Sequence, residues 1–128
     1  MILNASNVER PDSGIALLWE NQSPTSPYSG GKLAIDLSKY RLIYVTMMRS
    51  TTDQIASTIV SLVDHNLGPQ SVSFMDGSMF CQRNFTILTD GIDISSYALT
   101  CTIAPDGVTY AWDSKNTNGI PYRIYGSY

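Results

Sequence analysis

Three Asp-Gly pairs constrain the fold of this chain more than any other feature. They occur at Asp76-Gly77, Asp90-Gly91 and Asp106-Gly107, spaced 14 and 16 residues apart. An Asp-Gly pair readily supplies the positive φ angle that a tight hairpin turn needs. The segments between the pairs are rich in β-branched and aromatic residues. The pattern therefore predicts a series of consecutive antiparallel strands.

The remaining sequence adds further strand-length segments. Residues 15–19 form a short apolar run, and residues 41–48 form a longer one that is predicted to be a central strand buried on both sides. Residues 32–37 alternate between polar and apolar side chains, which also indicates a strand. Residues 120–125 form the last strand. Pro121 cannot donate to a ladder, which places this strand at an edge or a bulge.

Residues 55–63 fit both a helical stripe and a strand face, but their β-branched residues favour a strand. Nine aspartates against two glutamates, with eight tyrosines, also favour strands and turns over helices. The 128 residues suffice for one domain. We therefore expect an N-terminal arm at residues 1–14 and, at residues 15–128, an all-β antiparallel β-sandwich, jelly-roll-like, with about nine short strands.

Charge and hydropathy exclude several classes of partner. The net charge is −3, with no clustered basic face, which argues against binding to nucleic acid. No apolar run approaches the ~20 residues of a membrane span, and the first residues do not resemble a secretory signal. Cys81 and Cys101 both lie in predicted strands, where a bridge is possible. We favour two free thiols, because cysteine is often buried and the expected site of synthesis is the cytosol.

The sequence lacks the usual signatures of catalysis. His65 is the only histidine and lies in a predicted turn, and no G-x-S-x-G motif is present. No phosphate-binding loop and no EF-hand loop occurs either. A calcium site among the turn aspartates Asp76, Asp90 and Asp106 stays open on this weak signal. We therefore expect a protein that is not an enzyme and that uses no cofactor.

The aromatic residues are more informative. Tyr110 and Trp112 share one face of a predicted strand, next to a polar segment at residues 113–119 that is predicted to be a loop. Such rings suit surfaces that are both apolar and hydrogen-bonding. With them, Asp113, Asn116 and Asn118 are the candidate residues for binding a glycan. The competing interpretation is that Trp112 belongs to the core. Trp19 and Tyr44, inside apolar runs, are predicted to be core residues, although the same surface role is open to them.

Several motifs along the chain carry a family resemblance. Residues 17–26 read LLWENQSPTS, residues 33–40 read LAIDLSKY, and residues 43–45 read IYV. Gly107-Val108-Thr109 follows later, and the chain closes with IPYRIYG at residues 120–126. This order resembles a small β domain of bacteriophage virion proteins. That domain commonly forms the C-terminal part of tail-fibre, receptor-binding or head-fibre proteins.

The resemblance implies a virion structural protein, assembled in the host cytoplasm and displayed on the particle. It implies a homo-oligomer, most commonly a trimer, with other virion proteins as partners. The predicted loop and the rings beside it add the expectation that the ligand is a host surface glycan. The family domain often follows a long shaft, whereas here about fourteen residues precede it. We therefore expect the arm to attach the protein to the particle, with a face of the domain itself as the alternative. The alternatives are a capsid decoration protein without receptor binding and a free-standing carbohydrate-binding module. The resemblance supplies no catalytic residues.

Overall fold

The computed structural model describes residues 14–48, 55–63 and 67–128. These residues form strands and turns, and none of them lies in a helix that could cross a membrane. The described strands are β1 (Ile15–Glu20), β2 (Gly31–Leu33), β3 (Leu42–Met48), β4 (Ile55–Ser61), β5 (Gly68–Asp76), β6 (Met79–Leu88), β7 (Gly91–Ile103), β8 (Tyr110–Lys115) and β9 (Ile120–Ser127).

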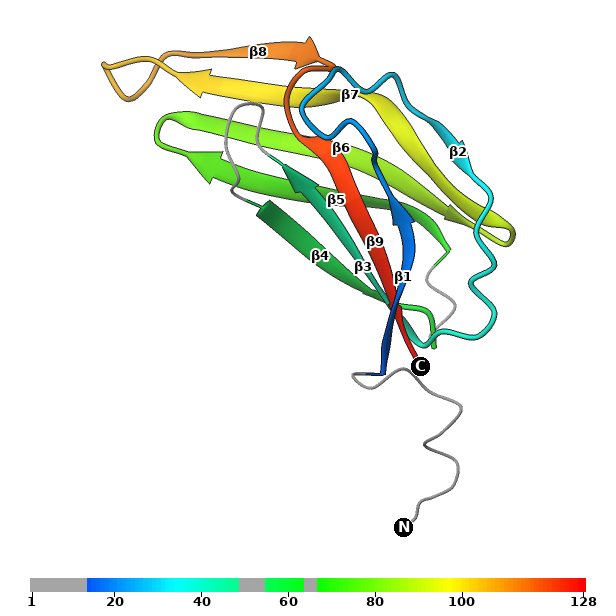
Figure 1. The fold of residues 1–128 in the computed structure, drawn as a ribbon. Coiled ribbons are helices and arrows are strands. Elements are labelled where there is room, and N and C mark those ends of the chain that lie inside the picture. Colours follow the sequence, from blue (N-terminus) through cyan, green and yellow to red (C-terminus); the bar gives the residue numbers. More distant parts are fainter. Residues whose placement is uncertain (1–13, 49–54, 64–66) are drawn as a thin grey trace.

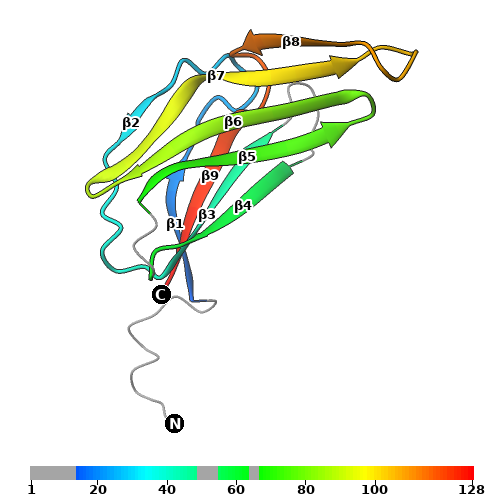
Figure 2. The same ribbon diagram turned by 180° about the vertical axis from the view of Figure 1, so that it is seen from behind.

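The strands form two antiparallel sheets that pack face to face (Figures 1 and 2). Sheet A has the order β1-β9-β3-β4, and sheet B has the order β2-β7-β6-β5 with β8 also paired to β7. Strands β5 to β8 follow one another as hairpins within sheet B. The fold is thus the predicted antiparallel β-sandwich.

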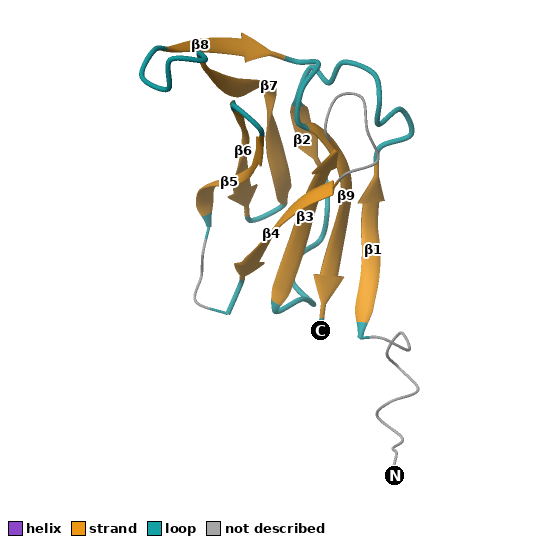
Figure 3. Ribbon diagram, turned by 90° about the vertical axis from the view of Figure 1, so that its left-hand side faces the viewer, coloured by secondary structure: helices purple, strands orange, loops and turns teal. Residues whose placement is uncertain are grey.

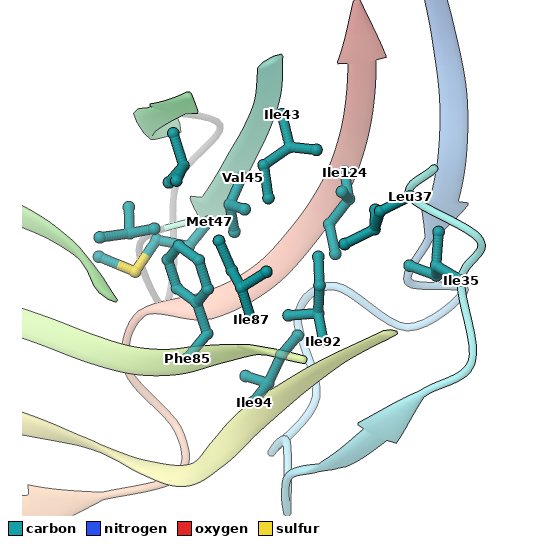
Figure 4. Packing of buried hydrophobic residues seen from close by; sticks show 12 residues of the cluster. Ile35, Leu37, Ile43, Val45, Met47, Phe85, Ile87, Ile92, Ile94 and Ile124 are labelled. Carbon is teal, nitrogen blue, oxygen red and sulfur yellow. The ribbon is translucent and has the colours of Figure 1, made fainter. Parts of the chain in front are cut away.

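The core lies between the two sheets (Figure 4). Along β3, the side chains of Ile43, Val45 and Met47 are buried, and the side chains between them are half-buried. This alternation corrects the prediction that the strand is buried on both sides, since one of its faces is the outer face of sheet A. The other core residues are Ile35, Leu37, Val60, Val72, Phe85, Ile87, Ile92, Ile94 and Ile124.

The turns follow the sequence prediction closely. The glycine of each Asp-Gly pair has a positive φ angle, 58° at Gly77, 157° at Gly91 and 76° at Gly107. These three glycines join β5 to β6, β6 to β7 and β7 to β8. The ambiguous segment at residues 55–63 is a strand, β4, through Ser61.

Pro121 shows how a proline enters an inner strand. β9 lies between β1 and β3, so the edge position is wrong and the alternative, a bulge, is confirmed. The β3–β9 register shifts between Val45 and Met47, and Met47 is the residue opposite Pro121. On the other side of β9, the pairing with β1 ends at Glu20↔Arg123. Pro121 lies beyond this pair, so its missing N–H breaks no hydrogen bond of the β1–β9 ladder.

Other local predictions need correction or lie outside the described residues. The strand predicted at residues 32–37 is shorter, because β2 ends at Leu33, although Ile35 and Leu37 still contribute to the core. Cys81 and Cys101 are free, as favoured. His65 and residues 1–13 of the arm lie outside the described residues.

Candidate binding surface on the β7–β8 hairpin

The candidate surface is built on the hairpin formed by β7 and β8. β8 pairs with the second half of β7, from Ile103↔Tyr110 to Ala98↔Lys115, while β2 pairs with the first half. The tip of this hairpin extends beyond the strands of sheet A (Figures 1 and 2), and β8 lies at the edge of sheet B, next to β7 (Figure 3). All six residues of β8 are therefore exposed.

An apolar patch covers the outer face of sheet B at this hairpin. Cross-strand pairing places Trp112 beside Cys101, Cys101 beside Phe80, and Phe80 beside Met75. Directly opposed residues of antiparallel strands project from the same face, so these four side chains form one row. Adding the other apolar residues of this face on β7 and β8 defines the outer patch: Met75, Phe80, Tyr97, Leu99, Cys101, Ile103, Tyr110 and Trp112.

The rings of the outer patch are well exposed to solvent. Trp112 is 60% exposed and Tyr110 is 62% exposed, so Trp112 is not a core residue. The outer face of a sandwich is usually polar. On β6 and β5 the same face does become polar, at Gln82 and Ser73. Because the apolar residues gather at one end, the outer patch has the character of a contact surface.

A small hollow lies at the tip of the same hairpin. It has a volume of about 210 Å³ and is lined by Thr102, Ala104, Thr109, Tyr110 and Ala111. Thr102 and Ala111 face away from the outer patch, because each neighbours a patch residue along its strand. Tyr110 therefore borders both the hollow and the outer patch.

A buried arginine holds the segments beside β8. Arg83 on β6 is only 2% exposed. Its guanidinium donates five hydrogen bonds, and all five acceptors among the described residues are backbone carbonyls. They belong to Gly119 (2.7 Å), Ser95 (2.6 Å), Asn118 (3.1 Å), Tyr28 (3.3 Å) and Asn116 (3.4 Å). Arg83 thereby connects the loop after β1, the middle of β7 and the turn after β8.

The position of Arg83 follows from the alternation of β6. Cys81, Arg83, Phe85 and Ile87 all point inward and are buried. The β6–β7 register shifts between Arg83 and Phe85, so a bulge interrupts the ladder beside the guanidinium. Burial lowers the pKa of Arg83 from its ordinary value. The carbonyl dipoles compensate for the lost hydration of the buried cation.

Sequence reasoning did not identify Arg83. A signal for it exists, because a single arginine interrupts an otherwise apolar inward row at period two. Its partners leave no such signal. Every residue carries a carbonyl, so the sequence does not reveal which carbonyls will converge on the guanidinium.

The structure separates the predicted site residues into three groups. Tyr110 and Trp112 lie together on the outer patch, as predicted. Asp113 follows Trp112 within β8 and projects from the opposite face. Asn116 is exposed and Asn118 is half-buried in the turn after β8, and the carbonyls of both bind Arg83. The five residues therefore do not surround one pocket.

The loop predicted at residues 113–119 begins later than expected, because β8 continues to Lys115. Residues 113–115 pair with residues 98–100 of β7. The backbone hydrogen bonds of this pairing outweigh the low β propensity of the Asp-Ser-Lys sequence. The carboxylate of Asp113 accepts a hydrogen bond from the backbone N–H of Ser114 at 2.8 Å. It also lies 3.7 Å from the ammonium of Lys115. These contacts engage Asp113 within its own strand.

Trp19 and Tyr44 have different environments. Trp19 packs against the core cluster and contacts Tyr28 edge-on at 6.2 Å between ring centroids, so its core assignment holds in part. Tyr44 is half-buried on the outer face of sheet A, between Ile59 and Tyr125. The prediction that Tyr44 is a core residue is therefore wrong, since β3 buries only its other face.

Among the described residues, no group of three or more histidine, cysteine, aspartate or glutamate side chains could hold a metal ion. Comparisons with protein families, with curated proteins and with solved structures found no match for this chain.

Proposed function

We propose that this protein is a small structural subunit of a bacteriophage particle, displayed at the virion surface as a tail-fibre or head-fibre type protein. Its proposed ligand is a glycan of the host surface, and its proposed partners are other virion proteins. The observation that carries the binding role is the pair of exposed rings, Tyr110 and Trp112, on an exposed strand. The virion location is supported by the family resemblance of residues 15–126.

The proposed binding mode is stacking of a sugar ring on the outer patch. Tyrosine and tryptophan present an apolar face to the pyranose C–H groups and polar atoms to its hydroxyls. Asn116 lies beyond the end of β8 and offers amide donors and acceptors at the rim. Affinity per site should be weak, with a Kd on the order of 0.1 to 1 mM, and multivalent display would give useful attachment. This role needs no catalytic residue and no cofactor.

The anchoring by Arg83 supports this role physically. The turn after β8 is fixed by carbonyl hydrogen bonds to a buried cation, so the base of the strand is held rigidly. A rigid base lowers the entropy that a binding surface loses when it takes up a ligand. The outer patch thus combines an exposed surface with a pre-organised support.

A second candidate function is capsid decoration without receptor binding. The outer patch is more apolar than a typical sugar platform, because Met75 and Phe80 extend it onto β5 and β6 and Ile103 lies opposite Tyr110. Such a surface also suits docking onto another virion protein. In this case the patch would be covered in the particle.

Two measurements test the proposed function. Particles induced from the strain that encodes this chain should be labelled by an antibody against the protein, and unlabelled particles would contradict the virion role. For ligand binding, Tyr110→Ala and Trp112→Ala should each weaken binding to an array of bacterial surface glycans at least about tenfold. Ile59→Ala is the matched control, since Ile59 is 60% exposed on sheet A. Glycan binding that survives both substitutions would contradict the binding role.

A further inference from the structure

β8 has an open edge. It pairs with β7 on one side, and no other described strand pairs with it. Its register with β7 runs without a bulge, and its six residues are exposed on both faces. An edge strand of this length, unbulged and exposed, is competent to pair with a further strand.

The other edges are less suited to such pairing. The pairing of β1 contains a register shift between Leu17 and Trp19. β2 is only three residues long, and β5 begins with Gly68-Pro69. β4 lies against β5 at the corner between the sheets. Bulges, short length and proline all protect an edge against pairing, so β8 is the most open of these edges.

The hydrogen-bond pattern shows which groups of β8 lie on its open edge. The Ala104 N–H donates to the Thr109 carbonyl at 2.7 Å, which makes this a hydrogen-bonded pair of the hairpin. Antiparallel alternation then directs the backbone groups of Ala111 toward β7. Those of Tyr110, Trp112 and Ser114 point to the open edge.

The open edge is shorter than the strand. The side chain of Asp113 already binds the N–H of Ser114 at 2.8 Å. Asp113 and Lys115 also place charges along this end of β8. The segment left for pairing is centred on Ala111, with Tyr110 and Trp112 on either side.

We propose that β8 pairs antiparallel with β8 of a second copy, about a two-fold axis at Ala111. In this register Tyr110 stands opposite Trp112 of the second copy, and the reverse pair follows by symmetry. Each of these two pairs is hydrogen-bonded in both directions, so four backbone hydrogen bonds join the copies. The two B sheets become one continuous sheet.

Other registers are less favourable. An axis at Trp112 would pair Tyr110 with Ser114, whose N–H is already bound to Asp113. An axis at Asp113 would place two carboxylates directly opposite each other, which is destabilising. The axis at Ala111 places no like charges opposite each other, and it brings the small Ala111 side chains together.

This pairing has a consequence for the outer patch. The side chains of Tyr110 and Trp112 stay on the outer face when the backbone edge pairs, so four aromatic rings meet around the axis. The dimer would thus present one doubled patch in place of two separate ones. The pairing does not depend on the proposed function, and it favours a two-fold oligomer over the trimer that the resemblance implies.

Substitutions at Trp112 separate the backbone from the ring. Trp112→Pro removes an N–H of the open edge and leaves the β7–β8 hydrogen bonds in place, whereas Trp112→Ala removes only the ring. In sedimentation velocity we expect the wild type to dimerise. Trp112→Pro should dimerise about 30-fold more weakly than Trp112→Ala, since it loses two more interchain hydrogen bonds. Ser114→Pro is the matched control and should still dimerise, because its N–H lies outside the pairing.

Cross-linking tests the register and does not depend on the proline variants. In a Cys101→Ser background, Ala111→Cys should form an interchain disulfide, because a non-hydrogen-bonded pair lies about 4.5 Å apart at Cα. Asp113→Cys should not, since Thr109 would be its neighbour. A monomer at about 100 μM, a trimer, or no cross-link at position 111 would each overturn the pairing. Loss of glycan binding in a Trp112→Ala dimer would leave the pairing intact, so the two proposals fail separately.

Discussion

The strand β8 and the turn that follows it are neighbours in sequence but are held in opposite ways. The turn is fixed from beneath, where carbonyls of Asn116, Asn118 and Gly119 bind the buried guanidinium of Arg83. Among the described strands, β8 pairs with β7 alone, and it is exposed on both faces. A surface strand can therefore stay exposed on both faces when the turn next to it is anchored to a buried side chain.

The largest test of this difference is Arg83→Met. It keeps much of the side-chain volume but removes five hydrogen bonds to backbone carbonyls. We expect the free energy of unfolding to fall by roughly 3 to 5 kcal/mol, measured by urea denaturation. The substitution should also broaden the amide NMR signals of residues 116–119.

Arg123→Met is the matched control for the substitution at Arg83. Arg123 donates to Glu20 at 2.8 Å, but both side chains are about one-third exposed, so water replaces the lost partner. Its loss of stability should be much smaller. Equal losses for the two arginines would contradict the anchoring role of Arg83.

Two glycines give a second, smaller contrast. Gly119 (φ 55°) and Gly107 (φ 76°) both have left-handed backbone, so alanine costs about 1 kcal/mol at each. At Gly119 the new Cβ would also lie 3.0 Å from the sulfur atoms of Cys81 and Met47, whereas at Gly107 it would have no neighbour within 4 Å among the described residues. Thermal denaturation should show Gly119→Ala to be about 2 kcal/mol more destabilising than Gly107→Ala. Equal effects would mean that the turn can relax.

Sequence alone predicted the parts of this contrast that depend on local pattern. The Asp-Gly corners and the shared face of Tyr110 and Trp112 follow from turn chemistry and period-two alternation. The anchoring by Arg83 could not be predicted, because its acceptors are carbonyls from segments distant in sequence. The second half of β8 was also not predicted. Asp113 has the character of a loop residue, and only its pairing with Thr100 of β7 makes it part of the strand.

The two cysteines allow the same contrast to be measured without destabilising the protein. Cys81 lies beneath Gly119, and burial raises the pKa of its thiol to about 11. Cys101 is half-buried on the outer patch. Because the thiolate is the reactive form, a thiol reagent at pH 8 should label Cys101 rapidly and Cys81 only after unfolding.

Cys101→Ser and Cys81→Ser assign the two labelling phases. The Cys101→Ser protein should lose the fast phase, and the Cys81→Ser protein should keep it. Fast labelling of Cys81 in the folded protein would mean that the region around Arg83 opens readily. The turn after β8 would then not be more firmly held than β8 itself.

The smallest expected effect lies at the tip of the hairpin, in the turn before β8. The carboxylate of Asp106 accepts hydrogen bonds from the hydroxyl and N–H of Thr109 and from the N–H of Val108. These hydrogen bonds hold the pKa of Asp106 below its usual range, and the one from the Thr109 hydroxyl has the largest effect. A depressed pKa in the folded state stabilises the fold above the unfolded value of about 3.9.

This contribution is therefore present at neutral pH and is lost as the pH falls below about 3.9 and through the lower pKa of folded Asp106. Asp106→Asn should be slightly less stable than the wild type at pH 7, and the two melting temperatures should converge toward pH 2. Because Asp106 is exposed, the difference should be small and should shrink in high salt. A difference that grows on acidification would show that the Asp106 carboxylate opposes the turn. β8 would then begin without the support that its other end receives from Arg83.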